Sequence, residues 1–263
     1  MIKFLHFSDF HIQERRGILR EGVDPCLKLE RIIEVAREMD VRPAFSIVTG
    51  DIAQDGSEEG YTIAKEYIRE IEALGGPVLP AVGNVDGREN FRRLLLGGTG
   101  DGPCFYSRTV GGLRVVVLDS QTPGANPGSF GEDQLEWLEE EVGEASVPCV
   151  IAFHHPVFDV PFLSGIVPAI FDPDDARRFR EIVAGGGVLG VLCGHLHQCM
   201  VSMEGGVPYV MSGSSYIEVS FKNGERRTHE ASGFNFLSYD GGNLTVRPVV
   251  FSEERGRVFK GLR

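Results

Sequence analysis

Seven side chains that can bind a metal ion lie along this 263-residue chain, each beside a glycine turn or at the end of an apolar run. Seven ligands are too many for one mononuclear site but suit two metals that share a carboxylate. Hydrolytic centres of that kind clamp a phosphoryl group between two cations about 3.5–4 Å apart. The candidate ligands are Asp9, His11, Asp51, Asn84, His154, His195 and His197.

The spacing of these residues suggests how they would bind. Asp51 follows Gly50 on a tight turn and is the natural carboxylate to bridge two metals, one through each oxygen. Asp9 and His11 are alternate residues of a segment that we expect to be extended, so their side chains would project to one side. The same is expected of the pair at 195 and 197. Asn84 offers a neutral carbonyl oxygen, which leaves room for an anionic substrate, and we predict Asp51 and Asn84 as the catalytic residues.

Each motif follows a predicted strand. Short apolar runs predict strands at 2–7, 45–48, 77–82, 147–153 and 188–193, and a hairpin at 104–118. Helical patterns between them cover 25–39, a segment capped by Ser57, 89–96 and 132–142. Parallel strands place ligand sites outside their carboxyl ends, and all five motifs lie at that end of a predicted strand.

This alternation of strands and helices predicts an α/β fold. We expect a four-layer sandwich of two mixed β-sheets flanked by α-helices. No repeat or linker divides the sequence, so residues 1–263 are predicted to form one domain. The β-rich part at 200–250 is expected to complete the second sheet.

Composition narrows the range of partners. Lys plus Arg number 26 and Asp plus Glu number 38, which gives a formal net charge of −12. Such a surface repels the phosphate backbone, so general nucleic-acid binding is not expected. No apolar stretch reaches membrane-spanning length, and the start lacks the apolar region of a signal peptide. We therefore expect a cytoplasmic protein without a membrane partner.

With these motifs the chain resembles the calcineurin-like metallophosphoesterases, whose motifs run D-x-H, G-D, G-N-H-[DE], H and G-H-x-H in this order. Within that family it is most similar to the bacterial class III cyclic-nucleotide phosphodiesterases and related glycerophosphodiesterases. The stretches 83–91 and 131–138 follow that group, and the resemblance covers nearly the whole chain.

The resemblance implies two metal ions, of manganese, iron or zinc, and a bridging hydroxide that attacks a small phosphodiester. One metal would be held by Asp9, His11, Asp51 and His197, and the other by Asp51, Asn84, His154 and His195. The chain departs from the family at Val85, where the family's histidine contacts the phosphate and can protonate the leaving group. General acid–base assistance is worth roughly 10²–10⁴-fold, so esters with good leaving groups should be favoured.

Several alternatives stay open. Val85 is compatible with a non-catalytic metal-binding scaffold, and a phosphomonoesterase or a nuclease would use the same ligands. His155 either contacts substrate or orients its loop through a backbone hydrogen bond. Asp86 is expected to cap the helix at 89–96 or to pair with Arg88. The apolar segment 157–171 suggests a lid over the site or the contact of a homodimer, and packing in the core is an equally open alternative.

Overall fold

The computed structural model describes residues 1–125, 127–160, 170–222 and 225–252. Five strands form the first sheet, in the order β13-β12-β1-β2-β3. In this sheet β1, β2 and β3 are parallel, whereas β12 is antiparallel to both β1 and β13. The strands are β1 (Ile2–Phe7), β2 (Phe45–Thr49), β3 (Val78–Ala81), β12 (Ala231–Tyr239) and β13 (Leu244–Ser252).

The second sheet has six strands in the order β4-β5-β6-β7-β9-β8. Its central strands β5, β6, β7 and β9 are parallel, and antiparallel strands lie at both edges. The strands are β4 (Tyr106–Val110), β5 (Leu113–Val117), β6 (Cys149–Ala152), β7 (Val188–Cys193), β8 (Met200–Glu204) and β9 (Val207–Met211).

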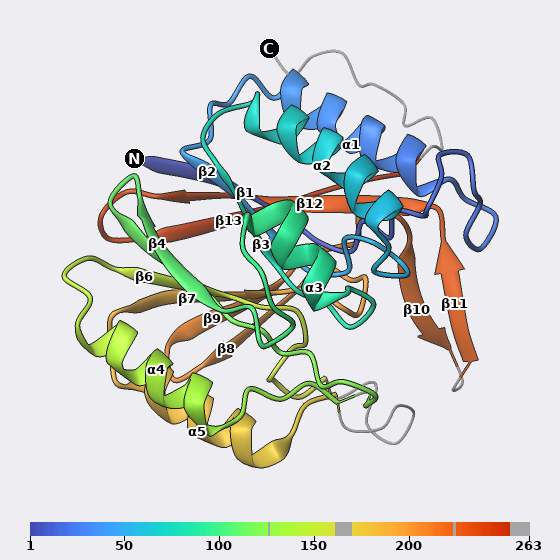
Figure 1. Ribbon diagram of the computed structural model, residues 1–263. Helices are drawn as coiled ribbons and strands as arrows, with labels where there is room; N and C mark the ends of the chain where they lie inside the picture. Colours follow the sequence, from blue (N-terminus) through green and yellow to red (C-terminus); the bar gives the residue numbers. More distant parts are fainter. Residues whose placement is uncertain (126, 161–169, 223–224, 253–263) are drawn as a thin grey trace, which may run out of the picture.

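Helices cover the outer face of each sheet, as Figure 1 shows. Helices α1 (Pro25–Glu38) and α2 (Glu58–Glu72) lie on the first sheet, and α4 (Glu132–Gly143) and α5 (Pro173–Ala184) lie on the second. The short α3 (Arg88–Phe91) continues as a π-helical turn, η1 (Arg92–Leu96). The predicted N-cap of α2 is confirmed, because the Ser57 hydroxyl accepts the Gly60 N–H at 3.1 Å.

Three apolar clusters correspond to the three interfaces of this sandwich. One lies between α1, α2 and the first sheet, one between the two sheets, and one between the second sheet and α4 and α5. Within β1, Leu5 and Phe7 pack toward the helices and Phe4 packs toward the other sheet. Strands buried on both faces produce the continuous apolar runs seen in the sequence. The predicted α/β fold with two mixed sheets and flanking helices is confirmed.

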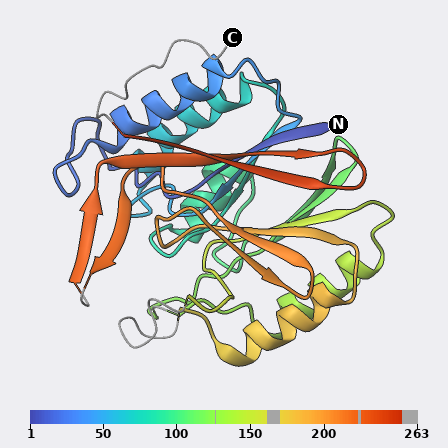
Figure 2. The same ribbon diagram turned by 180° about the vertical axis from the view of Figure 1, so that it is seen from behind.

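The expectation for residues 200–250 is wrong for most of that segment. Only β8 and β9 join the second sheet. Strands β10 (Glu218–Lys222) and β11 (Glu225–His229) form a separate hairpin that projects from the body of the molecule (Figure 2), and β12 joins β1. The reason is that β12 is buried on both faces, with Phe234 toward the helices and Leu237 between the sheets. Apolar alternation alone does not specify which sheet such a strand joins.

Helix α5 was not predicted. Its start carries clear signals, since Asp172 accepts the N–H groups of Asp174 and Asp175 at 3.0 Å and Pro173 occupies the first turn. Just before it, residues 161–169 of the predicted lid or dimer segment lie outside the described residues. Val157, Phe158 and Val160 at its start are buried. In the described part of the chain, no helix is long and apolar enough to cross a membrane.

Candidate metal centre

All seven predicted ligands come together where the strand ends of the two sheets meet. The loops after β1 and β2 are joined by main-chain hydrogen bonds from Asp9 N to Gly50 O and from His11 N to Asp51 O, of 3.0 and 2.9 Å. The loops after β6 and β7 are joined by Gly194 N to His154 O at 2.9 Å. Five ligands are buried, whereas Asn84 is exposed and His195 is partly exposed, so the site opens to solvent on the Asn84 side.

The backbone at this site is strained. Positive φ is uncommon for residues other than glycine, and here Asp9, His11, Asp51, His195 and His197 adopt φ between 51° and 74°. The expectation that residues 9 and 11 alternate along an extended segment is therefore wrong, and so is that for 195 and 197. Left-handed turns after the strand ends, and not the pleat of a strand, direct these side chains to a common point. Strain of this kind is typical of functional sites.

The first group of ligands surrounds the Nε2 atom of His11. That nitrogen lies 3.0 Å from His197 Nε2, 3.6 Å from Asp51 Oδ2 and 3.9 Å from Asp9 Oδ1. His197 Nε2 lies 3.5 Å from the same Asp9 oxygen. Asp9 Oδ1 is buried and accepts no hydrogen bond from any described residue. Four potential ligand atoms therefore face one another around a common centre.

A second group surrounds the Nε2 atom of His154. That nitrogen lies 3.0 Å from Asn84 Oδ1, 3.2 Å from His195 Nδ1 and 3.3 Å from Asp51 Oδ1. His195 Nδ1 in turn lies 3.0 Å from Asn84 Oδ1. Asp51 thus presents Oδ2 to the first group and Oδ1 to the second, which is the arrangement of a carboxylate shared by two metals.

The hydrogen bonds made by the Nδ1 atoms of His11 and His197 show that the first ligand group suits a metal cation. His11 Nδ1 lies 2.6 Å from Gln54 Oε1, and His197 Nδ1 lies 3.1 Å from the Ile217 carbonyl oxygen. Both partners accept, so each Nδ1 donates its hydrogen, and the Nε2 atom of each ring is the nitrogen that faces the other ligands. Two such nitrogens that face each other at 3.0 Å beside two carboxylates need either a shared proton or a metal cation between them. Ligating histidines usually show this type of second hydrogen bond.

The charges at the second ligand group also favour a bound cation. Burial acts to lower the pKa of His154, but the adjacent Asp51 carboxylate raises that pKa to about 9. The ring therefore holds a proton where a cation would compete with it. Burial lowers the pKa values of His11 and His195 to about 4, so both are neutral near pH 7. Burial acts to raise the pKa of Asp9, but the neighbouring His197 lowers it to about 2.

Asp86 joins the two loops that carry Asp51 and Asn84. Its buried carboxylate accepts the N–H groups of Ile52, Ala53 and Gly83 at 2.8 to 3.2 Å. It also accepts the Tyr61 hydroxyl at 2.7 Å. The expectation that Asp86 caps the helix at 89–96 or pairs with Arg88 is wrong, because main-chain donors of the site itself occupy the carboxylate.

Two glycines allow the ligand loops to approach closely. A Cβ atom at Gly83 would lie 2.1 Å from Asp51 N and 2.2 Å from Asp51 Oδ1. A Cβ atom at Gly194 would lie 1.8 Å from Ser8 Oγ and 2.8 Å from Asp9 Oδ2. Real Cβ atoms essentially never approach other heavy atoms closer than 3.0 Å. Glycine is therefore required at position 83 for the loops after β2 and β3 to meet, and at position 194 for the two sheets to share one site.

Val85 and His155 flank the second group. The Val85 N–H donates to Asp51 Oδ1 at 3.1 Å, so this residue contacts the shared carboxylate through its main chain. His155 is 1% exposed, and its Nδ1 lies 2.9 Å from Ser120 Oγ. The His155 Nε2 atom is buried without a hydrogen-bond partner among the described residues. The hydrogen bond to Ser120 supports the loop-orienting alternative, and substrate binding by His155 stays a prediction.

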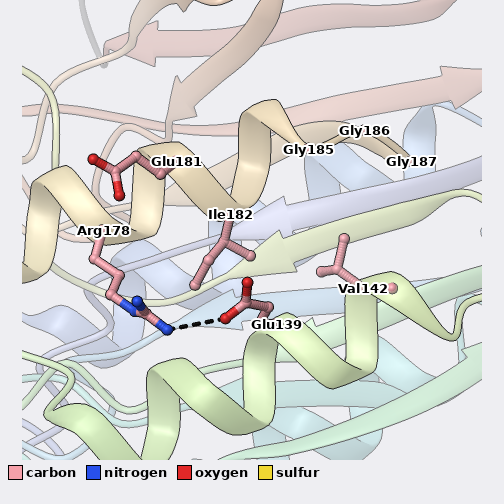
Figure 3. Close-up of a pocket in the computed structure, with 9 residues that line it drawn as sticks. Glu139, Val142, Arg178, Glu181, Ile182, Gly185, Gly186 and Gly187 are labelled. Carbon is pink, nitrogen blue, oxygen red and sulfur yellow. Dashed lines mark hydrogen bonds and ion pairs between the residues drawn. The ribbon is translucent and has the colours of Figure 1, made fainter.

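A separate cavity of about 490 Å³ lies between α4 and α5 (Figure 3). Arg178 and Glu139, which form an ion pair of 2.9 Å, line this cavity together with residues 185–187. None of the seven candidate ligands lines it. The chemistry of the chain is therefore expected at the strand ends and not in this cavity.

The residues that orient the ligands were not predicted from the sequence. Gln54, Thr49 and Ile217 accept the ring hydrogens of three histidines, but two of them do so through main-chain carbonyls, which leave no trace in residue type. Asp119 and Gln121 were also missed. Their signal was present, because they follow the apolar run of β5 at the same edge as the other motifs.

Comparison with known proteins agrees with this geometry. The family model of the calcineurin-like phosphoesterases matches residues 2–199. A probable cyclic nucleotide phosphodiesterase of Rhodococcus erythropolis is 30% identical over 96% of this chain and 88% of its own. A probable glycerophosphodiester phosphodiesterase, GpdQ, of Arcobacter nitrofigilis is 27% identical over 74% of this chain and 72% of its own.

Among solved structures, the purple acid phosphatase PPD1 of yellow lupin superposes with a TM-score of 0.61 at 15% identity. The match covers 98% of this chain and 52% of that one. At this level of identity the likeness concerns the fold, which is the same sandwich of two mixed sheets.

Proposed function

The chain belongs to the calcineurin-like phosphoesterase family, and from this premise we propose that it hydrolyses small phosphodiesters at a two-metal centre that shares Asp51. Its relatives establish the broader class, because they are phosphodiesterases of a metal-dependent family. The chain is accordingly a metal-dependent phosphoric ester hydrolase. The finer proposal concerns the number of metals and the substrate.

One observation carries the two-metal centre: the two oxygens of Asp51 face two different ligand groups, at 3.6 Å from His11 Nε2 and 3.3 Å from His154 Nε2. The first metal would be held by Asp9, His11, Asp51 and His197. The second would be held by Asp51, Asn84, His154 and His195. Mixed nitrogen and oxygen ligands of this kind suit manganese, iron or zinc.

When bound, the metals would supply positive charge to the phosphoryl oxygens and activate water for attack. The protein's part is to hold that chemistry in place. Asp51 fixes both ligand groups to a single carboxylate, and Asp86 joins the loops that carry Asp51 and Asn84. Asn84 is the exposed ligand, so substrate is expected to enter on its side. Its neutral amide adds no negative charge against an incoming phosphate.

Val85 supports a preference for diesters with good leaving groups. Its side chain has no acidic hydrogen, so it cannot protonate the leaving group. The relatives named above are a probable cyclic nucleotide phosphodiesterase and a probable glycerophosphodiester phosphodiesterase, and we propose a substrate of that size and charge for this chain. An overall charge of −12 disfavours a long nucleic-acid substrate.

Metal content and turnover, measured together, test this proposal. We expect two metals per chain by elemental analysis and hydrolysis of bis(p-nitrophenyl) phosphate and of a cyclic nucleotide with Mn²⁺. Asp51→Asn should lower both metal content and turnover, whereas Asp133→Asn, on the exposed side of α4, should leave both unchanged. Full metal content without turnover on any diester would instead support the non-catalytic scaffold, and an unaltered Asp51→Asn variant would refute the centre.

A further inference from the structure

The side-chain amide of Gln121 holds the loop that carries Asn84. Its Nε2 atom donates to the carbonyl oxygens of Gly83 at 3.0 Å and Asp86 at 2.7 Å. The Asn84 carbonyl oxygen lies 3.5 Å from the same nitrogen. The two short bonds use both hydrogens of the amide and grip the loop on either side of Asn84.

Gln121 is itself fixed by a buried ion pair. The Gln121 N–H donates to Asp119 Oδ1 at 2.9 Å, and the Gln121 carbonyl accepts Arg88 Nη2 at 2.6 Å. Arg88 binds Asp119 through two bonds, of 2.8 and 3.1 Å. The Asp119 side chain is fully buried and that of Arg88 is 12% exposed, so this pair is shielded from water. A paired guanidinium and carboxylate of this geometry are strongly directional.

The chain of contacts continues into helix α4. Gln134 Oε1 accepts the Asp119 N–H at 2.7 Å, and Gln134 Nε2 donates to the Asp119 carbonyl at 2.9 Å. Gln134 is buried and lies in the first turns of α4. A continuous set of hydrogen bonds therefore runs from a helix of the second sheet, through Asp119 and Gln121, to a loop of the first sheet.

We propose that Gln121 is a positioning residue that sets the affinity of the second metal by holding Asn84. The proposal rests on the two-metal centre proposed above. Asn84 is the most exposed member of the second ligand group, so it gains the least from surrounding packing. None of the contacts of Gln121 reaches Asp9, His11 or His197, so the first metal should not depend on it. Deletion of an outer partner of a metal ligand typically weakens binding by roughly 10–100-fold.

Calorimetric titration of the apoprotein with Mn²⁺ can resolve this dependence. The binding step that disappears in Asn84→Ala identifies the second metal. We expect Gln121→Met, which keeps the side-chain length but removes both donors, to raise the Kd of that step by roughly 10–100-fold. The Kd of the first step should not change. Gln121→Glu, which turns an oxygen toward the loop carbonyls, should weaken the second step at least as much.

A matched control is Gln198→Met, since Gln198 also donates to a carbonyl, that of Val219 at 2.5 Å, but away from Asn84. The Gln198→Met variant should bind the second Mn²⁺ with the wild-type Kd. Excess Mn²⁺ should restore the kcat of Gln121→Met, which it would not do for a variant with a damaged fold. Equal weakening of both steps, or no change in either, would overturn the positioning role. A wild-type protein that binds one metal would refute the two-metal centre, and with it this role.

Discussion

Gly83→Ala should disable the metal centre by adding a single methyl group. Gly83 precedes Asn84, and its Cα faces the loop that carries Asp51. The added Cβ would lie 2.1 Å from Asp51 N and 2.2 Å from Asp51 Oδ1. Both atoms belong to the residue that is shared by the two ligand groups. The substitution therefore acts on the bridge without removing any ligand.

The size of the displacement follows from these distances. Cβ atoms essentially never approach below 3.0 Å, so the contact at 2.1 Å must open by at least 0.9 Å. The surroundings cannot absorb this movement, because Asp51 is buried and Asp86 ties Ile52 and Ala53 to Gly83 itself. Metal–ligand distances tolerate about 0.2 Å. A shift near 1 Å in a catalytic geometry lowers rates by about 100-fold.

We therefore expect Gly83→Ala to lose at least about 100-fold in kcat on bis(p-nitrophenyl) phosphate and to bind less than two metals per chain. The control is Gly143→Ala, at the end of α4, where a Cβ meets nothing within 4 Å. That variant should keep wild-type kcat and metal content. Elemental analysis and steady-state kinetics at saturating Mn²⁺ measure both quantities. Wild-type kcat with two metals bound in Gly83→Ala would refute the close approach of the two loops.

Three further predictions follow from individual contacts. Val85→His should raise kcat for an alkyl phosphodiester more than for a p-nitrophenyl diester, by up to roughly 10²–10⁴-fold, and equal gains would argue against an acid role at this position. Arg88→Ala leaves the buried Asp119 carboxylate without its cation, which should cost about 3–5 kcal/mol and several degrees of Tm in a thermal melt; an unchanged Tm would count against it. Burial lowers the pKa of His6 to about 3, so the unfolded chain gains a proton below pH 6.5 that the folded chain does not, and stability falls as pH falls from 6.5 toward 3. In denaturant titrations with chelator, the wild type should lose about 2 kcal/mol more than His6→Gln between pH 7 and pH 5, and equal losses would contradict this pKa.

The parts of the fold that could be predicted are those whose residues form a recognisable pattern along the sequence. Strands buried on both faces appear as apolar runs, and the ligand motifs follow them directly, so the location of the site was predictable. The position of β12 was not, because both of its faces are apolar and either sheet offers a suitable neighbour. Its partner β1 is selected by contacts between residues more than 200 positions apart, such as Ile2 with Tyr239.

The ligand set was predictable for a similar reason, but its backbone was not. Residue type identifies Asp9 and His11 as metal ligands, but it does not fix φ near 50°, which aspartate and histidine adopt only more often than other non-glycine residues do. That conformation is imposed by main-chain bonds to the loop after β2. The role of Asp86 was missed for the same reason, since its partners are N–H groups of Ile52, Ala53 and Gly83, which every non-proline residue has.

The hydrogen bonds behind the histidine rings also limit how this centre can change in evolution. His154 and His197 are oriented by the carbonyl oxygens of Thr49 and Ile217, and no point mutation deletes a main-chain carbonyl. His11 alone of the three depends on a side chain, Gln54. A Gln54→Glu change would place a carboxylate beside His11 Nδ1 and make His11 Nε2 a stronger electron-pair donor to a metal. Of these three partners, Gln54 is thus the one whose substitution could alter the metal preference of the proposed first site while every ligand stays the same.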